Sequence, residues 1–320
     1  MSALRSSAAV SFALVASTAA LVACGGAKSP ATPATPVTPA TPATPVTLDR
    51  HAAEESNVNA YVLSDGQGAI VIDATRTPKD GAAIAALLAQ RTAGPVTVLI
   101  THGHPDHFLG LGALRAALPQ ARFVVARPEI KADAIGMATW MASQGWLDAL
   151  PAMKPRTDQH AAGFDYEREL EVLTEPRLTL PGGAVLELTT SYPATEAEHM
   201  TTAYSPQLNA LFTGDLAYQD VHLWLGVGVT RDAARAWQAT LDQLAAAWAA
   251  KQPIVYPGHG APTDASVFAA DRAYIEEVLA ITAAASSDED AMAKMIARYP
   301  GHANRDFLLK MSVANLRTQK

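Results

Sequence analysis

An α/β layered fold is predicted by two observations on the sequence. Short runs rich in β-branched residues alternate with longer segments whose apolar residues recur every three or four positions, and this alternation is typical of sheets covered by helices. Several of the short runs also lead directly into histidine or aspartate residues. Sites in layered α/β proteins form where strand ends and their loops converge, so we expect the functional residues there.

The first predicted elements are a β-hairpin, a helix and a buried strand. Glycines and an aspartate at positions 64–68 separate two β-rich runs, which is a hairpin signal. Apolar residues recur at helical spacing around Ile84 and Leu88, and Gly94-Pro95 then breaks the chain before a run of Val, Leu and Ile. The predicted strands are 59–63, 69–73 and 96–100, and the predicted helix is 78–91.

The middle of the chain is predicted to hold a further helix and strand, an irregular stretch and a second hairpin. The stretch 128–176 lacks a steady period and is predicted as helical turns and loops. Four large apolar residues in it either line a pocket over the site or pack in the core. They are Trp140, Met141, Trp146 and Met153. The other predicted elements are the helix 109–118, the strand 123–126 and the hairpin strands 178–180 and 185–190.

The C-terminal part is predicted to alternate strands with long helices. A strand at 208–213 ends in Gly214-Asp215, and a strand at 254–256 leads into the Gly-His turn around His259. The helix 231–251 between them repeats alanine, leucine and tryptophan at spacings of three and four. From Asp264 onward the chain is predicted to be mostly helical.

Composition and charge fit a globular protein with a small-molecule partner. The chain has 320 residues, of which 49% are hydrophobic and 17% charged, enough for a large core. Its net charge of −7 repels phosphate backbones, and no basic patch in the sequence offsets it, so a nucleic-acid partner is not expected. The sequence leaves the oligomeric state open.

The first 23 residues have the pattern of an export signal. Arg5 supplies positive charge, and the apolar stretch 8–23 is too short for a membrane span. Its end, Leu21-Val22-Ala23-Cys24-Gly25, resembles the lipobox of bacterial lipoproteins, which implies cleavage before Cys24 and lipid attached to that residue. The alternative is an ordinary secretory peptide with a chance cysteine.

A low-complexity segment follows the signal. Ala-Thr-Pro and Val-Thr-Pro units repeat between positions 31 and 45, and such a segment forms an extended spacer. We therefore predict a signal peptide at 1–23, a linker at 24–47 and one domain at 48–320. Glycine rather than aspartate follows Cys24, so we expect a lipid anchor at the periplasmic face of the outer membrane, as the chain's only membrane contact.

A buried strand is predicted to lead into THGHPDH at 101–107, which holds three of the nine histidines of the chain. His102 and His104 are two positions apart and project to the same side of an extended backbone, and Asp106 and His107 follow on the next turn. Clustered imidazoles would repel one another when protonated, whereas with a carboxylate they bind divalent cations. The alternative is that these histidines cap a helix or lie on a solvated loop.

This string resembles the signature motif of the metallo-β-lactamase superfamily, and three later positions continue the family pattern: His199, Asp215 and His259. The resemblance implies a four-layer αββα sandwich with two divalent metal ions at one sheet edge. It implies a first metal site formed by His102, His104 and His199, a second formed by Asp106, His107 and His259, and Asp215 bridging the two.

One position departs from the family pattern. Glu198 precedes His199, where family members usually have Gly or Pro. His222 is the other histidine nearby, and we interpret it as either pocket-facing or structural. Tyr218 and Trp224 are further pocket candidates because they follow closely after the predicted bridging aspartate.

The predicted chemistry is metal-assisted hydrolysis. Two divalent ions lower the pKa of a water that bridges them and give hydroxide at neutral pH, which attacks an electrophilic carbonyl or phosphorus. The ions also stabilise the charge that develops on the substrate oxygen, and Asp106 orients the nucleophile and relays a proton. We expect zinc, with iron or manganese as alternatives, because all three accept nitrogen and oxygen ligands.

The residue at position 215 narrows the substrate class. An aspartate there resembles the thioesterases, lactonases and phosphodiesterases of the superfamily rather than its true β-lactamases, which carry Cys or Ser. The acidic charge and the export signal argue against nucleases. We therefore predict a hydrolase of a small ester, lactone, thioester or amide. A β-lactamase is one alternative, and a non-catalytic periplasmic lipoprotein that binds a metal or ligand is another.

Overall fold

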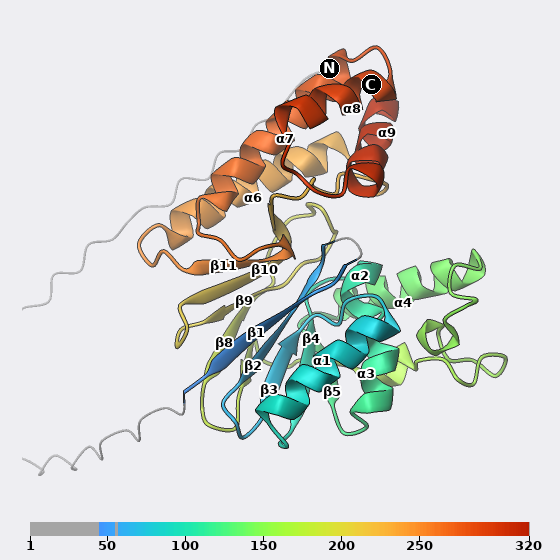
Figure 1. Cartoon of the computed structure of the whole chain (residues 1–320), viewed down its shortest axis with the longest axis vertical. Helices are drawn as coiled ribbons and strands as arrows, with labels where there is room; N and C mark the ends of the chain where they lie inside the picture. The colour runs from blue at the N-terminus through green and yellow to red at the C-terminus, as the bar shows by residue number, and fades with distance from the viewer. Residues whose placement is uncertain (1–44, 55–56, 320) are drawn as a thin grey trace, which may run out of the picture. The chain divides into compact units, whose positions relative to one another are not determined.

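The computed structural model of the chain describes residues 45–54 and 57–319 (Figure 1). The predicted signal peptide at 1–23, the lipidation site Cys24 and the predicted linker up to residue 44 lie outside the described residues. Within the described part of the chain, no helix combines the length and the apolar character that a membrane span requires.

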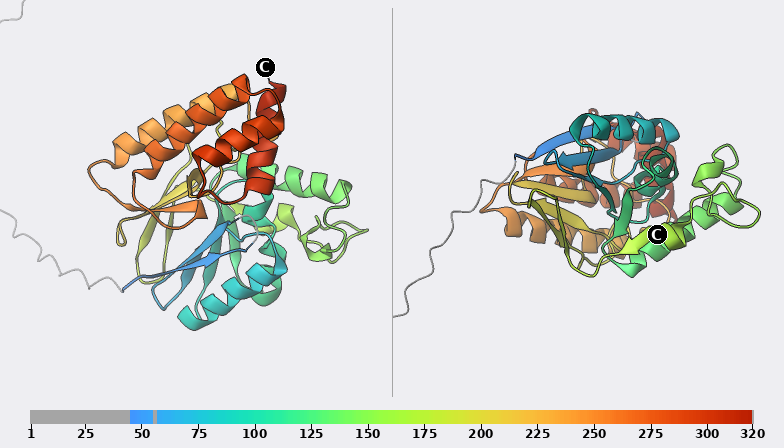
Figure 2. Two further views of the ribbon diagram at one scale, coloured as in Figure 1. Left: turned by 45° about the horizontal axis from the view of Figure 1, so that its top comes forward. Right: turned by 90° about the horizontal axis from the view of Figure 1, so that it is seen from below.

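Two mixed β-sheets lie face to face between two groups of helices, as the predicted αββα sandwich requires (Figures 1 and 2). Among the described residues, the first sheet has six strands in the order β1-β2-β3-β4-β5-β6, and the second has five in the order β11-β10-β9-β8-β7. The first sheet consists of β1 (Thr47–Ala52), β2 (Asn59–Ser64), β3 (Ala69–Ile72), β4 (Val96–Ile100), β5 (Arg122–Val125) and β6 (Leu170–Val172). The second consists of β7 (Arg177–Thr179), β8 (Val185–Thr189), β9 (Thr202–Ser205), β10 (Ala210–Gln219) and β11 (Ile254–Gly260).

Helices cover the outer face of each sheet. The first sheet is covered by α1 (Pro78–Arg91), α2 (Pro105–Phe108), α3 (Leu111–Ala117), α4 (Pro128–Ser143) and α5 (Tyr166–Glu169). The second is covered by α6 (Arg231–Trp248), α7 (Val267–Ala284), α8 (Asp288–Arg298) and α9 (Lys310–Thr318). A 3₁₀ turn at Pro151–Met153 and a π-helical turn at Arg305–Leu309 complete the helical elements of the described chain.

Side-chain alternation along β2 explains how the layers pack. Ala60 and Val62 face the helices that cover the first sheet, whereas Tyr61 and Leu63 face the second sheet. Successive side chains of a strand point to opposite faces, and both faces are buried here, so the strand has a near-continuous apolar sequence. Full burial of such a side chain stabilises the fold by about 1.5–3 kcal/mol.

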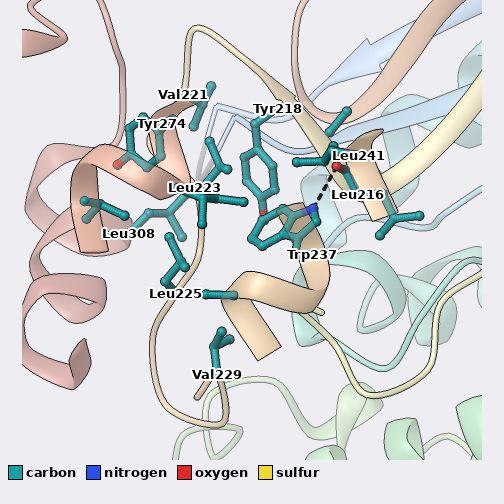
Figure 3. Packing of buried hydrophobic residues seen from close by; sticks show 14 of the residues in the cluster. Leu216, Tyr218, Val221, Leu223, Leu225, Val229, Trp237, Leu241, Tyr274 and Leu308 are labelled. Carbon is teal, nitrogen blue, oxygen red and sulfur yellow. Dashed lines mark hydrogen bonds between the residues drawn. The ribbon is translucent and has the colours of Figure 1, made fainter. Parts of the chain in front are cut away.

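The core between the second sheet and its helices surrounds Trp237 of α6 (Figure 3). The indole Nε1 of Trp237 donates a 3.0 Å hydrogen bond to the carbonyl oxygen of Leu216 in β10. Leu223 and Leu225, which follow β10, pack in the same cluster as Leu308 of the π-helical turn. The C-terminal segment is therefore anchored against the chain that leaves β10.

Parallel pairing brings several strand ends to one edge of the sandwich. β3, β4 and β5 run parallel to one another, and β10 runs parallel to β11. The two sheets meet at this edge, where Val58 forms a β-bridge with His259 and the Tyr61 hydroxyl donates a 2.7 Å hydrogen bond to the Pro257 carbonyl. The carboxyl ends of the strands that were predicted to carry functional residues thus lie close together.

The helix α4 differs from the prediction for its region. The stretch 128–176, predicted as helical turns and loops, contains this continuous 16-residue helix. Two of its buried residues, Ala134 and Ala138, are small, so the apolar period in the sequence is weak. Met141 and Met153 are core residues, whereas the side chains of Trp140 and Trp146 are 47% and 59% exposed and contact each other.

Two strands continue further than predicted. β10 extends to residue 219 and β11 to residue 260, so Asp215 and His259 lie within strands rather than after them. Register shifts in the pairing of β10 with β11 occur between Phe212 and Gly214 and between Gly214 and Tyr218. Such irregularities change the direction of side chains within a strand. This explains how Asp215 can belong to β10 and still face the sheet edge.

Candidate metal centre

The loop after β4 turns into α2 within the THGHPDH string. His104 has an extended backbone and precedes the first residue of α2, and Pro105 occupies the first turn of this helix. Proline favours that position because its φ angle is already helical. Asp106 and His107 then lie on the helical turn, while His102 lies on the extended segment. The change from extended to helical backbone directs the two pairs of side chains to different points.

The structure brings seven polar side chains together in two groups, with the candidate ligand atoms of each group within 4.8 Å of one another. The first group consists of His102, His104, Glu196 and Asp215, and the second consists of Asp106, His107 and His259. Six of the seven predicted metal ligands therefore converge. They come from the end of β4, from β10 and from β11.

Asp215 lies between the two groups. One carboxylate oxygen, Oδ1, is 3.1 Å from Nε2 of His107, and the other, Oδ2, is 3.1 Å from Nε2 of His259. Oδ2 is also 3.8 Å from Nε2 of His102, which belongs to the first group. A carboxylate that contacts both groups in this way has the geometry that a bridging ligand needs.

His199, predicted as a ligand of the first metal, lies outside the first group in the described part of the chain. Nδ1 of His199 instead lies 2.8 Å from Oδ2 of Asp133 on α4, and among the described residues His199 belongs to neither group. Glu196 takes the predicted place, with Oε1 only 2.5 Å from Nδ1 of His104. The loop is fixed by a 2.9 Å hydrogen bond from the Thr201 N–H to the Thr101 carbonyl.

A search for histidines alone misses Glu196. The side chain is almost fully buried, and a buried carboxylate is rare unless it is paired or binds a metal. Burial is not visible in the sequence, because the surrounding segment Thr195–Met200 has no regular period. Glu196 could have been considered from the sequence only because carboxylates, like imidazoles, bind divalent ions.

Asp73, at the end of β3, orients the histidines of the loop. Its carboxylate accepts hydrogen bonds from the backbone N–H of Thr101 at 2.8 Å and from the Thr101 hydroxyl at 2.9 Å. The same carboxylate lies 2.8 Å from Nδ1 of His107. This pairing leaves Nε2 of His107 directed at Asp215, and such outer partners fix the ring orientation of metal-binding histidines. The sequence did not single out Asp73.

Tyr218 and Gly258 position the second-sheet side of the site. The Tyr218 hydroxyl donates a 2.6 Å hydrogen bond to Oδ2 of Asp215, and its ring stacks on His259 at 4.8 Å between ring centroids. A Cβ atom at Gly258 would lie 1.9 Å from Oδ1 of Asp215, so only glycine fits there. Tyr218, predicted as a pocket candidate, is buried and supports the cluster instead.

Burial and neighbouring charges set opposing pKa shifts in the cluster. Burial, with His107 nearby, lowers the pKa of His102 well below its usual value. Burial opposes protonation of His104 too, but the carboxylates of Glu196, Asp106 and Asp215 together outweigh it and raise the pKa of His104 to about 9. Burial raises the pKa of Glu196 to about 7. For Asp215, burial favours the neutral form, but the imidazoles of His107 and His259 together outweigh it and keep the carboxyl pKa well below its usual range.

Several buried polar atoms of the cluster have no hydrogen-bond partner among the described residues. They include Nε2 of His102 and Oε2 of Glu196, which lie 3.9 Å apart and thus beyond hydrogen-bond distance. Buried polar atoms are almost always paired, so a group of orphans needs an explanation. Imidazole nitrogens and carboxylate oxygens that converge in this way fit divalent cations of the zinc, iron or manganese type.

His222 and Trp224 have different surroundings. His222 is fully buried, with Nδ1 2.8 Å from the Tyr274 hydroxyl, and belongs to neither ligand group among the described residues. This position favours the structural interpretation of His222. Trp224 lies at the site, with its ring 6.5 Å from the ring of His104.

Comparisons with known proteins agree with this arrangement. A family model described as the metallo-beta-lactamase superfamily matches residues 53–259. The match begins after β1 and ends at His259, so it includes strands of both sheets and the two ligand groups. A search of the curated proteins found no relative that matches the chain.

Solved structures share the fold at low sequence identity. A metallo-beta-lactamase family protein from Thermus thermophilus is 18% identical with a TM-score of 0.57, over 84% of this chain and 90% of that one. A beta-lactamase domain protein from Burkholderia ambifaria is 18% identical with a TM-score of 0.59, over 87% and 85%. The sec-alkyl sulfatase PisA1 is 17% identical with a TM-score of 0.54, over 82% of this chain but only 47% of that one.

Proposed function

Because the chain belongs to the metallo-β-lactamase superfamily, we propose that it is a hydrolase that uses two divalent cations to cleave a small ester, lactone, thioester or amide. Members of this superfamily are usually metal-dependent hydrolases that bind two divalent ions. The observation that carries the proposal is the meeting of the two ligand groups at Asp215. A protein that binds a single structural ion would not need this shared carboxylate.

Each cation would have its own set of protein ligands. His102, His104 and Glu196 would hold the first, and Asp106, His107 and His259 would hold the second, with Asp215 shared between them. When bound, such a pair supplies Lewis-acid polarisation of a substrate oxygen and an activated water. We propose zinc as the metal, since four of the seven side chains are imidazoles, with iron or manganese as the alternatives that the carboxylates also accept.

The open side of the cluster is set by two of its members. The side chains of His104 and Asp106 are 22% and 18% exposed, whereas those of the other five are nearly or fully buried. A substrate would therefore approach past His104 and Asp106. With the ions bound, Asp106 would orient the attacking water and relay its proton to the leaving group.

The choice of substrates for testing follows from the chemistry and from the fold relatives. The carboxylate at position 215 favours esters, lactones, thioesters and amides over β-lactams, which stay in the panel as the alternative. Sulfate esters are included because one protein with the same fold is a sec-alkyl sulfatase. No nucleic acid is included, because the net charge of −7 disfavours it.

The experiment compares purified, metal-free and reloaded protein. We expect elemental analysis to give about two divalent ions per chain, and we expect turnover of at least one substrate class that a chelator abolishes and added metal restores. His104→Ala should abolish turnover, whereas His160→Ala, a change at an exposed histidine outside both groups, should not. Metal binding without turnover of any substrate would instead support the non-catalytic metal-binding alternative.

We also propose that the mature protein is a lipoprotein of the bacterial cell envelope, at the periplasmic face of the outer membrane. The proposal rests on the lipobox-like string that ends at Cys24 and on the proline-rich segment after it. Mass spectrometry of the mature N-terminus should detect acyl chains on Cys24, and Cys24→Ser should release the protein from membranes. An unmodified N-terminus at another position would favour the ordinary secretory peptide.

A further inference from the structure

A cavity of about 420 Å³ lies between the chain around Asn57 and the C-terminal segment 302–307. We propose that this cavity is a substrate-binding subsite, which holds the part of the substrate next to the scissile bond when that part is an uncharged aromatic ring. This inference rests on the proposed hydrolase function and adds the substrate class to it.

The N-terminal wall of the cavity is joined directly to the metal cluster. The carbonyl of Asn57 accepts a 3.0 Å hydrogen bond from the N–H of Gly260, and Val58 forms a β-bridge with His259. Asn59 reinforces this junction, because its side-chain amide donates a 2.7 Å hydrogen bond to the carbonyl of Gly260. A ligand in the cavity would therefore lie beside the strand that carries a second-group histidine.

An aromatic pair connects the cluster to the opposite wall. The ring of Trp224 lies edge-on to the ring of His104, with 6.5 Å between centroids. The ring of Phe307 stacks on Trp224, with 5.8 Å between centroids and 24° between the planes. Phe307 lines the cavity, and its side chain is 49% exposed. Because His104 is one of the two exposed cluster members, the aromatic pair begins at the open side of the site.

The C-terminal wall is held in place by backbone pairing and core packing. Ala303 forms a β-bridge with Val221, and the His222 N–H donates a 3.1 Å hydrogen bond to the Ala303 carbonyl. Leu308, next to Phe307, packs in the core with Leu223 (Figure 3). The exposed phenyl ring is thus attached to a fixed backbone, which favours its use as a rigid surface for stacking.

The remaining lining determines what the distal part of the ligand can be. Asn57 and Asn304 present amides, and burial lowers the pKa of His302, so that this ring faces the cavity as a neutral group. Arg305 carries a positive charge, whereas Glu54 and Asp306 carry negative charges. Because carboxylates outnumber the guanidinium in this lining, an anionic group on the ring is disfavoured, while Phe307 accounts for the ring itself.

The test compares matched substrates in wild-type and variant holoprotein. Benzyl acetate is compared with ethyl acetate, and ethyl phenylacetate with ethyl acetate, so that the ring is placed on the alcohol or the acyl side. We expect Phe307→Ala to raise KM about 3- to 10-fold for one of the ring-bearing esters, with kcat, ethyl acetate turnover and metal content unchanged. Phe307→Tyr should retain the wild-type KM. Trp146→Ala, a change at an exposed aromatic residue just beyond the end of α4, is the control.

A binding measurement separates this inference from the proposed function. N-Benzylacetamide and N-ethylacetamide, amide counterparts of these esters, are titrated against the same proteins by ligand-observed NMR. Loss of N-benzylacetamide binding in Phe307→Ala supports the subsite even if none of these esters is hydrolysed. Amide binding and KM that are unaffected by Phe307→Ala overturn the subsite, whether or not the esters are hydrolysed. The hydrolase proposal is decided separately, because it fails only if no substrate class in the full panel is turned over.

Discussion

The two sides of the candidate metal centre are assembled in different ways. The first-sheet side, defined as His102, His104, Asp106 and His107, comes from one stretch of six residues after β4. The second-sheet side, defined as Glu196, Asp215 and His259, comes from a loop and two strands that are far apart in the chain. The first-sheet side depends on a local backbone turn, whereas the second-sheet side depends on how β10, β11 and the loop before β9 pack.

Their supports differ accordingly. The first-sheet side is held through one buried carboxylate, Asp73, which contacts both Thr101 and His107. The second-sheet side is held by an aromatic hydroxyl, from Tyr218, and by a glycine at 258 that leaves room for Asp215. The comparison indicates that ligands from one short stretch of chain need a contact with the neighbouring strand to fix their orientation. Ligands from distant parts of the chain instead need close packing between the strands that carry them.

The largest effect is expected where the two sides meet. Asp215→Asn removes the carboxylate charge that contacts both groups, and loss of about 4 kcal/mol of transition-state stabilisation would lower kcat/KM on the order of 1,000-fold. The bound metal should fall below two ions per chain. Asp232→Asn, a change of the same kind at an exposed site on α6, is the control. Full metal content and activity in Asp215→Asn would contradict a bridging role.

A smaller effect is expected from substitutions in the loop before β9, which test whether Glu196 or His199 belongs to the second-sheet side. Glu196→Gln should weaken binding of one of the two ions by about 100-fold, because it removes a charged ligand from the first group. His199→Gln should leave both ions in place, since His199 contacts Asp133 instead. Metal titration by calorimetry measures both. The reverse result would restore the predicted role of His199.

Smaller effects are expected for the supporting residues. Asp73→Asn weakens the contacts that orient Thr101 and His107, and Tyr218→Phe removes the hydrogen bond to Asp215. Loss of such outer partners typically lowers metal affinity by about 10- to 100-fold. Competition with a coloured chelator would measure the change. If both variants bound metal like the wild type, the two sides would be shown to hold their shape without these anchors.

The smallest effect concerns a buried carboxylate beneath the second-sheet side. Asp271 on α7 accepts a 2.8 Å hydrogen bond from the Tyr218 N–H, and burial raises the pKa of Asp271 well above its usual value. The folded state therefore holds this proton more tightly than the unfolded state. Stability from Asp271 is present at pH below its unfolded pKa of about 4 and is lost as pH rises towards the folded pKa.

Asp271→Asn removes this titration. We expect the difference in free energy of unfolding between the variant and the wild type to shift steadily in favour of the variant as the pH rises above about 4. Urea unfolding at several pH values measures it. Parallel stability profiles for the two proteins would show that Asp271 does not change its protonation between the folded and unfolded states.

Local signals identified some elements well and others poorly. The helix at 78–91 was predicted with the bounds that α1 has, because its apolar residues follow the helical period and Gly94-Pro95 breaks the chain after it. α4 was missed because its buried stripe includes two alanines, which carry little periodic signal. The strand ends at Asp215 and His259 were placed too early, because bulges that continue a strand leave no mark in hydrophobicity.

The sequence by itself determined the layered fold class and the first-sheet side of the site, because a buried strand followed by clustered imidazoles and a carboxylate is a local pattern with a local chemical meaning. Only the tertiary structure placed Glu196 rather than His199 in the ligand groups, and showed that Asp73 and Tyr218 contact the cluster. The physical reason is that side-chain direction in irregular loops, and contact between distant segments, depend on packing between the layers rather than on sequence spacing.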